Sequence, residues 1–75
     1  MTFDNLKHVI SEISKLPLNE IQEHSSFKED LEIDSLQMVN LVIEIQTRFG
    51  IDISKIQSND DLVSVGSMFT AFTRE

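Results

Sequence analysis

Residues 35–50 read SLQMVNLVIEIQTRFG and have the clearest helical pattern in the chain. Their apolar side chains recur at three- and four-residue steps, which is the period of an amphipathic helix. They are Leu36, Val39, Leu41, Val42, Ile43, Ile45 and Phe49. The β-branched residues among them suit a strand, but the length and the interspersed Gln, Asn and Glu residues favour a helix. We predict one helix from about Ser35 to Phe49, ended by Gly50.

The apolar surface of this helix is broader than one core-facing stripe requires. We therefore expect side chains on it to stay partly exposed for contact with partner proteins. The candidates are Met38, Val39, Val42 or Ile43.

The start of the helix carries a capping pattern. Asp34 can accept a backbone N–H, and Gln37 three residues later completes a capping box. Ile33 and Met38 occupy the flanking positions of a hydrophobic staple. This pattern places Ser35 on the first helical residue, with its hydroxyl pointing outward beside unpaired N–H groups. Because the dipole and free donors of a helix N-terminus favour phosphate, Ser35 is well prepared to carry a phosphodiester.

The first part of the chain predicts another helix and a long loop. Apolar residues at helical spacing predict a helix from about Asp4 to Leu16, capped by Thr2 or Asp4 and ended by Pro17. Its apolar residues are Phe3, Leu6, Ile10, Ile13 and Leu16. Residues 17–33 predict a loop pinned by sparse apolar side chains. These are Leu18, Ile21, Phe27, Leu31 and Ile33.

The last part of the chain predicts two short helical elements. Ser58 or Asn59 opens a helical turn through Leu62, and Ser64 caps a last helix. The apolar face of that helix comprises Val65, Met68, Phe69 and Phe72. Residues 73–75 are expected to fray.

Composition favours binding or carrying over catalysis. The chain has 75 residues, 40% of them hydrophobic, with 2 Gly and 1 Pro, which is typical of one small helical domain over residues 1–75. Such a domain has little material for both a core and an internal active-site cavity. A net charge of −7 disfavours nucleic acid and anionic membrane as partners.

The chain contains no cysteine, which is consistent with a reducing cytoplasm. Without Cys the chain has no disulfide framework and no thiolate nucleophile, and any thiol chemistry must be imported. The charged start, MTFDNLKHVISEISKL, is neither a signal peptide nor a membrane span. We expect a cytoplasmic protein.

No metal site is predicted. Asp30, Glu32 and Asp34 alternate like the start of a calcium loop, but the sixth position of that loop is not Gly and the twelfth is not Glu. His8 and His24 are isolated in the sequence, so we expect both on the surface and neither as a ligand.

Residues 27–53, FKEDLEIDSLQMVNLVIEIQTRFGIDI, resemble the acyl carrier protein family, whose signature is Asp-Ser-Leu at the start of the second helix. The likeness covers nearly the whole chain and includes the first helix, the long loop, Phe27, Asp30-Leu31, an Ile53 anchor and a short terminal helix. It implies an all-α fold. That fold is a small four-helix bundle with three main helices, a short third helix and a long loop between helices 1 and 2.

The resemblance implies that Ser35 receives 4′-phosphopantetheine from coenzyme A, in a magnesium-dependent reaction of a separate phosphopantetheinyl transferase. The arm would supply the missing thiol and tether acyl intermediates as thioesters for synthase enzymes. No evident base lies beside Ser35 in sequence, which agrees with a carrier and not an enzyme. In the family, the residue matching Asp34 helps hold the transferase's metal and the residue matching Leu36 contributes to recognition. The expected partner surface is Asp34, Leu36, Gln37, Met38, Val39, Asn40 and Ile43.

Two departures from the family pattern bear on geometry and partners. The family usually has Gly where this chain has Glu32, so we expect ordinary backbone angles there. Carriers of fatty-acid synthases have an acidic second helix, whereas here only Glu44 keeps a negative charge. The corresponding positions are Gln37, Asn40, Gln46, Thr47 and Arg48. Because charge complementarity governs partner choice, we expect a dedicated carrier of a specialised polyketide, lipid or nonribosomal peptide pathway.

Two other functions stay open. The chain could carry aminoacyl or peptidyl groups, or it could be an unmodified helical interaction domain that shares the fold. The Asp before Ser35 and the absence of a Gly-Gly pair resemble acyl carriers more closely. A start at Met1 and no Pro- or Gly-rich linker at either end favour a free-standing carrier. We also expect a monomer. Acids just before the serine, which are Glu29, Asp30, Glu32 and Asp34, would steer it toward a basic transferase.

Overall fold

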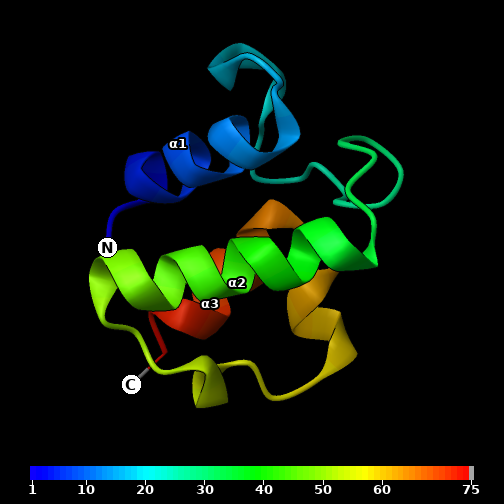
Figure 1. Cartoon of the computed structure of the whole chain (residues 1–75). Coiled ribbons are helices and arrows are strands. Elements are labelled where there is room, and N and C mark those ends of the chain that lie inside the picture. The colour runs from blue at the N-terminus through cyan, green and yellow to red at the C-terminus, as the bar shows by residue number, and fades with distance from the viewer. Residues whose placement is uncertain (75) are drawn as a thin grey trace.

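The computed structural model describes residues 1–74, in which three α-helices are connected by loops that contain short 3₁₀-helices. The α-helices are α1 (Phe3–Ser14), α2 (Ser35–Phe49) and α3 (Val65–Phe72). The 3₁₀-helices are η1 (Leu18–Glu20), η2 (Ile53–Lys55) and η3 (Asn59–Leu62). In Figure 1, α2 crosses the middle of the molecule, with α1 along one side and α3 behind it. The predicted all-α class is confirmed, and the expected short third helix is the 3₁₀ turn η3.

α1 begins as predicted and ends earlier than predicted. Thr2 caps it by accepting the backbone N–H of Asn5 at 3.1 Å. The predicted end at Leu16 is wrong, because the helix ends at Ser14 and Lys15 takes a left-handed conformation with φ of 66°. The backbone N–H of Lys15 still bonds to the Ser11 carbonyl at 2.9 Å. The helix is therefore closed by a left-handed cap before Pro17 can end it.

The loop between α1 and α2 is pinned to the core at four of the five predicted positions. Ile21, Phe27, Leu31 and Ile33 are buried. The prediction for Leu18 is wrong, because this residue lies in the exposed turn η1, in which no residue is buried. Backbone bonds also hold the loop to the segment before α3, from Phe27 N–H to the Val63 carbonyl and from Val65 N–H to the Ser25 carbonyl, each 3.0 Å long.

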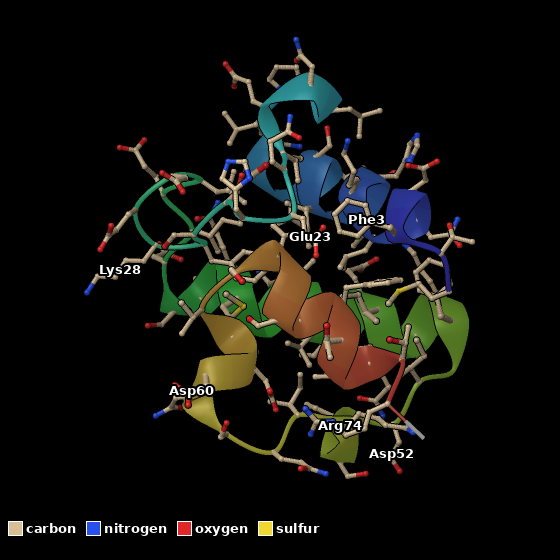
Figure 2. The ribbon with its side chains drawn as sticks, turned by 180° about the vertical axis from the view of Figure 1, so that it is seen from behind. Phe3, Glu23, Lys28, Asp52, Asp60 and Arg74 are labelled. Carbon is tan, nitrogen blue, oxygen red and sulfur yellow. The ribbon has the colours of Figure 1, made fainter. Side chains whose placement is uncertain are left out.

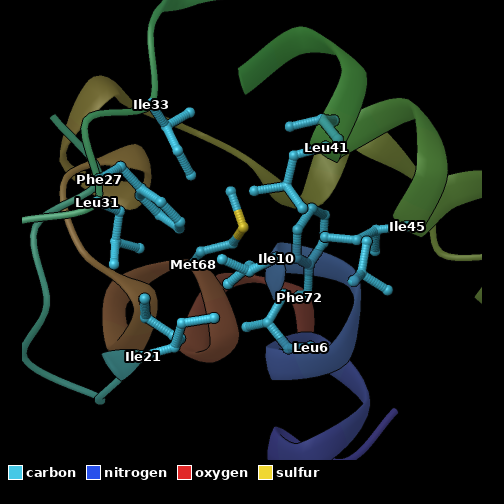
Figure 3. Packing of buried hydrophobic residues seen from close by; sticks show 13 residues of the cluster. Leu6, Ile10, Ile21, Phe27, Leu31, Ile33, Leu41, Ile45, Met68 and Phe72 are labelled. Atoms are coloured by element: carbon cyan, nitrogen blue, oxygen red, sulfur yellow. The ribbon is translucent and has the colours of Figure 1, made fainter. Parts of the chain in front are cut away.

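One hydrophobic core joins the three helices and the long loop (Figure 3). Its buried members come from the three α-helices and the loop between α1 and α2, and α2 contributes Leu41, Val42 and Ile45. The others are Leu6, Val9, Ile10, Ile21, Phe27, Leu31, Ile33, Val65, Met68 and Phe72. Because α2 is fixed along this side, its opposite side and its first turn remain available for contacts.

The segment after α2 differs from the prediction at η2, which was not predicted, and at Ile53 within it. η3 begins after Ser58, and Ser64 caps α3 by accepting the Ser67 N–H at 3.2 Å, both as predicted. Ile53 was expected as an anchor, but it lies in η2 with 47% of its surface exposed, on the wall of a surface groove. Of the residues predicted to fray, Glu75 lies outside the described residues. Among residues 1–74, no helix has the length and apolar character to cross a membrane.

Candidate functional site

The first turn of α2 is fixed by a reciprocal capping box, as predicted. The Oδ1 atom of Asp34 accepts the backbone N–H of Gln37 at 2.8 Å. The Oε1 atom of Gln37 accepts the backbone N–H of Asp34 at 3.2 Å. The backbone N–H groups of Asp34 and Gln37 are thereby satisfied, and the position of Ser35 between them is set.

Ser35 is the first residue of α2 and is exposed. Within residues 1–74 its hydroxyl has no hydrogen-bond partner, and the backbone N–H groups of Ser35 and Leu36 have none either. An exposed hydroxyl therefore lies beside two free donors at the positive end of a helix of 15 residues. This arrangement can display a nucleophilic oxygen to another enzyme and stabilise a negatively charged group attached to it.

An open groove of about 860 Å³ begins beside Ser35. Phe27 and Ile33 from the long loop, Met38 and Val39 from α2, and Leu62 and Val63 near η3 give it apolar walls. Its polar lining consists of Ser26, Lys28, Glu29, Glu32, Asp34 and Ser35. A flexible chain attached to the serine could lie along this groove in contact with apolar atoms.

A second, smaller groove of about 280 Å³ continues from the first along α2. The two grooves share Met38, Val39 and Leu62. The remaining lining residues are all apolar: Val42, Ile43, Ile53 and Ile56. The exposure of Ile53 is thus part of this surface.

Glu32 corrects the expectation of ordinary backbone angles before the serine. It has φ of 53°, in the left-handed region that favours glycine. The flanking Leu31 and Ile33 are both buried, and the Ile33 N–H bonds to the Phe27 carbonyl at 2.7 Å. These tertiary contacts force the reversal on the residue between them, so the backbone keeps this turn even with a glutamate side chain.

The predicted partner surface is mostly exposed. Leu36, Val39 and Ile43 expose 71%, 53% and 50% of their surface, and Asp34 and Asn40 are exposed beside them. Gln37 and Met38 are half-buried. Val42 was a candidate for exposure, but it is buried because it faces the core with Leu41 and Ile45. The exposed apolar residues therefore form one stripe, set apart from the core-facing side of α2.

The charges at the far end of α2 are paired. Arg48 bonds to Glu44 one turn earlier at 2.9 Å and to Glu12 of α1 at 2.6 Å. The hydrogen bond that Arg48 donates to Glu12 is the main cause that raises the pKa of Arg48 above its usual value, and Glu44 adds to this effect. α2 therefore carries one acidic and one basic side chain, which bond to each other, so the helix itself has no net negative charge.

The two histidines lie as predicted. Both His8 and His24 are exposed, and Nδ1 of His8 lies 2.7 Å from the Asp4 carbonyl oxygen on the same helix. In the part of the chain that the structure describes, no three His, Cys, Asp or Glu residues are grouped as metal ligands would be.

Sequence reasoning missed the far wall of the groove. Leu62 and Val63 reach it through the bridge between Ser26 and Ser64, a contact between segments far apart in the chain. No local pattern signals such a pairing. Lys28 was also missed, although its place in the sequence close to four acidic residues was a visible signal.

Comparison with known proteins agrees with this geometry. Residues 4–67 match the model of a family described as "Phosphopantetheine attachment site". An acyl carrier protein of Thermobifida fusca is 40% identical over 57 residues, which are 76% of this chain and 72% of that protein. One of Chlamydia caviae is 36% identical over 89% of this chain and 86% of its own length. One of Helicobacter hepaticus is 37% identical over 84% of this chain and 90% of its own length.

The residues at the start of α2 fit the group that this family carries. An exposed hydroxyl, two free N–H donors and an adjoining apolar groove suit a phosphodiester with a long flexible chain. When bound, that group supplies a thiol, which this cysteine-free chain lacks. The chain therefore belongs to the acyl carrier protein family, whose members are non-catalytic carriers of a phosphopantetheine arm.

Proposed function

We propose that Ser35 is the attachment residue for 4′-phosphopantetheine and that acyl groups are carried on the arm as thioesters. The observation that carries this proposal is the exposed Ser35 hydroxyl at the capped start of α2, beside unpartnered N–H donors and an open groove. In the reaction, Ser35 Oγ forms a bond to the pantetheine-bearing phosphorus of coenzyme A. The bond from that phosphorus to the nucleotide breaks, the nucleotide leaves with the electron pair, and the serine proton passes to the transferase.

The intact mass of the protein shows directly whether the arm is attached. Coexpression with a promiscuous phosphopantetheinyl transferase should add the mass of one phosphopantetheinyl group to the wild type and none to Ser35→Ala. Ser54→Ala is the matched control, because Ser54 is also exposed but does not line the groove beside Ser35. It should be modified like the wild type. An unchanged wild-type mass would support the alternative of an unmodified interaction domain.

We also propose that the exposed side of α2 serves a dedicated pathway of polyketide, lipid or nonribosomal peptide synthesis and not general fatty-acid synthesis. Support comes from the apolar stripe of Leu36, Val39 and Ile43, and from the pairing of Glu44 with Arg48. The exposed side of α2 offers little negative charge to complement a basic docking surface on a fatty-acid synthase enzyme. Because electrostatic complementarity sets encounter rate and partner choice, such enzymes should bind this helix weakly. The partner surface would be Asp34, Leu36, Gln37, Met38, Val39, Asn40 and Ile43.

Restoring the charge tests this choice of partner. Gln37→Glu, Asn40→Glu and Gln46→Glu together return acidic residues to α2, and Gln37→Glu keeps the reach needed for the capping box. The modified triple variant should be turned over faster than the wild type by generic fatty-acid synthase enzymes, and the gain should shrink as salt is added. High turnover of the unaltered protein by those enzymes would contradict the specialised role. Mass spectrometry of the native holo-protein would separate acyl from aminoacyl or peptidyl cargo.

We propose that residues 1–75 act as one acyl-carrier domain, as a monomer in the cytoplasm. The single core shared by the three helices and the absence of cysteine support this view. Sedimentation should give one monomeric species. The unfolding transitions recorded by two different probes should coincide, as expected for one cooperative domain. Cell fractionation should place the protein with cytoplasmic markers.

A further inference from the structure

Lys28 is the one basic residue among those that line the groove beside Ser35 in the described part of the chain. The other charged residues of that lining are Glu29, Glu32 and Asp34. A phosphodiester at Ser35 would add a further negative charge to this acidic region, where like charges repel one another. A single cation on the same groove would offset that repulsion.

The Lys28 ammonium is available for such a contact. Its side chain is exposed and makes no salt bridge or hydrogen bond within residues 1–74, although acidic residues follow it in the chain. Two nearby carboxylates have other donors: Asp30 accepts the Ser26 N–H at 2.7 Å, and Asp34 accepts the Gln37 N–H at 2.8 Å. Figure 2 shows Lys28 reaching away from the body of the molecule.

We propose that Lys28 binds the phosphodiester of the arm attached to Ser35 and holds the base of the arm at the mouth of the groove. This inference rests on the proposed attachment at Ser35. The free N–H groups of Ser35 and Leu36 would contact the phosphate from the helix side. Lys28 would contact it from the loop side as a charged donor. Lys28 is then a positioning residue for the arm.

Nuclear magnetic resonance of the modified protein tests the contact. The samples are wild type, Lys28→Gln, Lys28→Arg and Lys7→Gln, each shown by intact mass to carry one arm. Lys7 is a matched control because it lies on α1 and does not line the groove. Lys28 is exposed, so its substitution should leave the circular dichroism spectrum unchanged.

The phosphorus resonance of Lys28→Gln should be displaced from that of the wild type at about 10 mM salt, where the screening length is about 30 Å. The displacement should shrink toward zero near 1 M salt, where that length is about 3 Å. Lys28→Arg should stay close to the wild type because it keeps the charge, and Lys7→Gln should superimpose on it. The Cε and Hε signals of Lys28 should move when the arm is added, and those of Lys7 should not.

Two results would overturn the inference in distinguishable ways. If the modified wild type and Lys28→Gln have the same phosphorus resonance at low salt, and the Lys28 signals do not move on modification, the contact is absent although the arm is present. If the wild type gains no arm, the proposed attachment at Ser35 fails, and the inference fails with it.

Discussion

Asp34 and Gln37 cap each other's backbone across the first turn of α2, through bonds of 2.8 and 3.2 Å. This pair holds Ser35 at the start of the helix, so the cap and the candidate site are one local structure. Stability and modification can therefore be separated by the choice of substitution at Asp34.

Asp34→Ala should lower the free energy of unfolding by about 1 kcal/mol, because the capping acceptor is lost. The free energy of unfolding of Asp34→Asn should be within about 0.5 kcal/mol of the wild-type value, because Asn caps a helix as well as Asp does. Yet this variant should be modified more slowly, because the carboxylate proposed to help hold the transferase's metal is gone. Urea unfolding and the rate of mass gain check the two effects. Equal modification rates for Asp34→Asn and the wild type would remove the metal role and leave Asp34 as a cap only.

Glu32→Gly should stabilise the protein. A side chain at φ of 53° costs about 1–2 kcal/mol, and glycine avoids that strain but loses more backbone entropy on folding. The expected net gain is about 0.5–1 kcal/mol in the free energy of unfolding, measured by urea titration. Glu29→Gly is the control: Glu29 is exposed in the same loop without a positive φ, so this substitution should destabilise. A loss of stability in Glu32→Gly would show that the left-handed turn is not strained.

Gly66→Ala should destabilise, although alanine is the better helix former. An added Cβ would lie 2.8 Å from Cγ and 2.9 Å from the carbonyl oxygen of Glu23, which Figure 2 labels close to the start of α3. The Gly66 N–H also bonds to that carbonyl at 2.8 Å, so the two segments cannot separate freely. Such overpacking costs about 1–3 kcal/mol, which thermal unfolding would detect.

A double variant identifies the contact. Glu23→Ala removes the clashing Cγ but keeps the carbonyl, so it should recover only part of the loss in Gly66→Ala. Full recovery would mean that the backbone contact between Glu23 and Gly66 carries none of the effect.

Asp61 should make stability depend on pH in the acid range. It is buried and accepts the backbone N–H of Gln57 at 2.8 Å, with Arg74 3.4 Å away. The Gln57 bond, helped by the charge of Arg74, holds the pKa of Asp61 below its usual value. A lowered folded-state pKa contributes stability that is complete above about pH 3.9 and is lost as the pH falls through the folded value.

Melting temperatures between pH 7 and pH 2 check this dependence. Asp61→Asn should melt lower than the wild type at pH 7 and lose less on acidification. Asp60→Asn is the control, because Asp60 is exposed beside it and makes no side-chain hydrogen bond within residues 1–74. Parallel acid limbs for the wild type and Asp61→Asn would contradict the linkage.

Local signals explain what the sequence predicted well. α2 has the predicted bounds because its apolar period lies within the element, and its cap Asp34 and the left-handed Gly50, with φ of 64°, lie directly beside its two ends. The end of α1 was predicted too late because its left-handed cap is Lys15, and a lysine does not indicate a helix end in the sequence as a glycine does. The angle at Glu32 was missed because the burial of its neighbours, a tertiary effect, imposes it.

The site was predicted at its centre and not at its edges. Ser35 and its cap follow from adjacent residues, whereas Leu62 and Val63 join the groove through a bridge between distant segments. The same limit applies to Ile53, since its exposure depends on how η2 lies against α2.

Peptide mapping of the protein from its native host locates the arm on the chain. Cleavage after Lys28 and Arg48 releases residues 29–48, in which Ser35 is the only serine. If Ser35 is the attachment residue, this peptide carries one phosphopantetheinyl group, and fragment ions place it on Ser35. A peptide 29–48 that is always unmodified, or a group placed on Thr47 or on another peptide, would contradict attachment at Ser35.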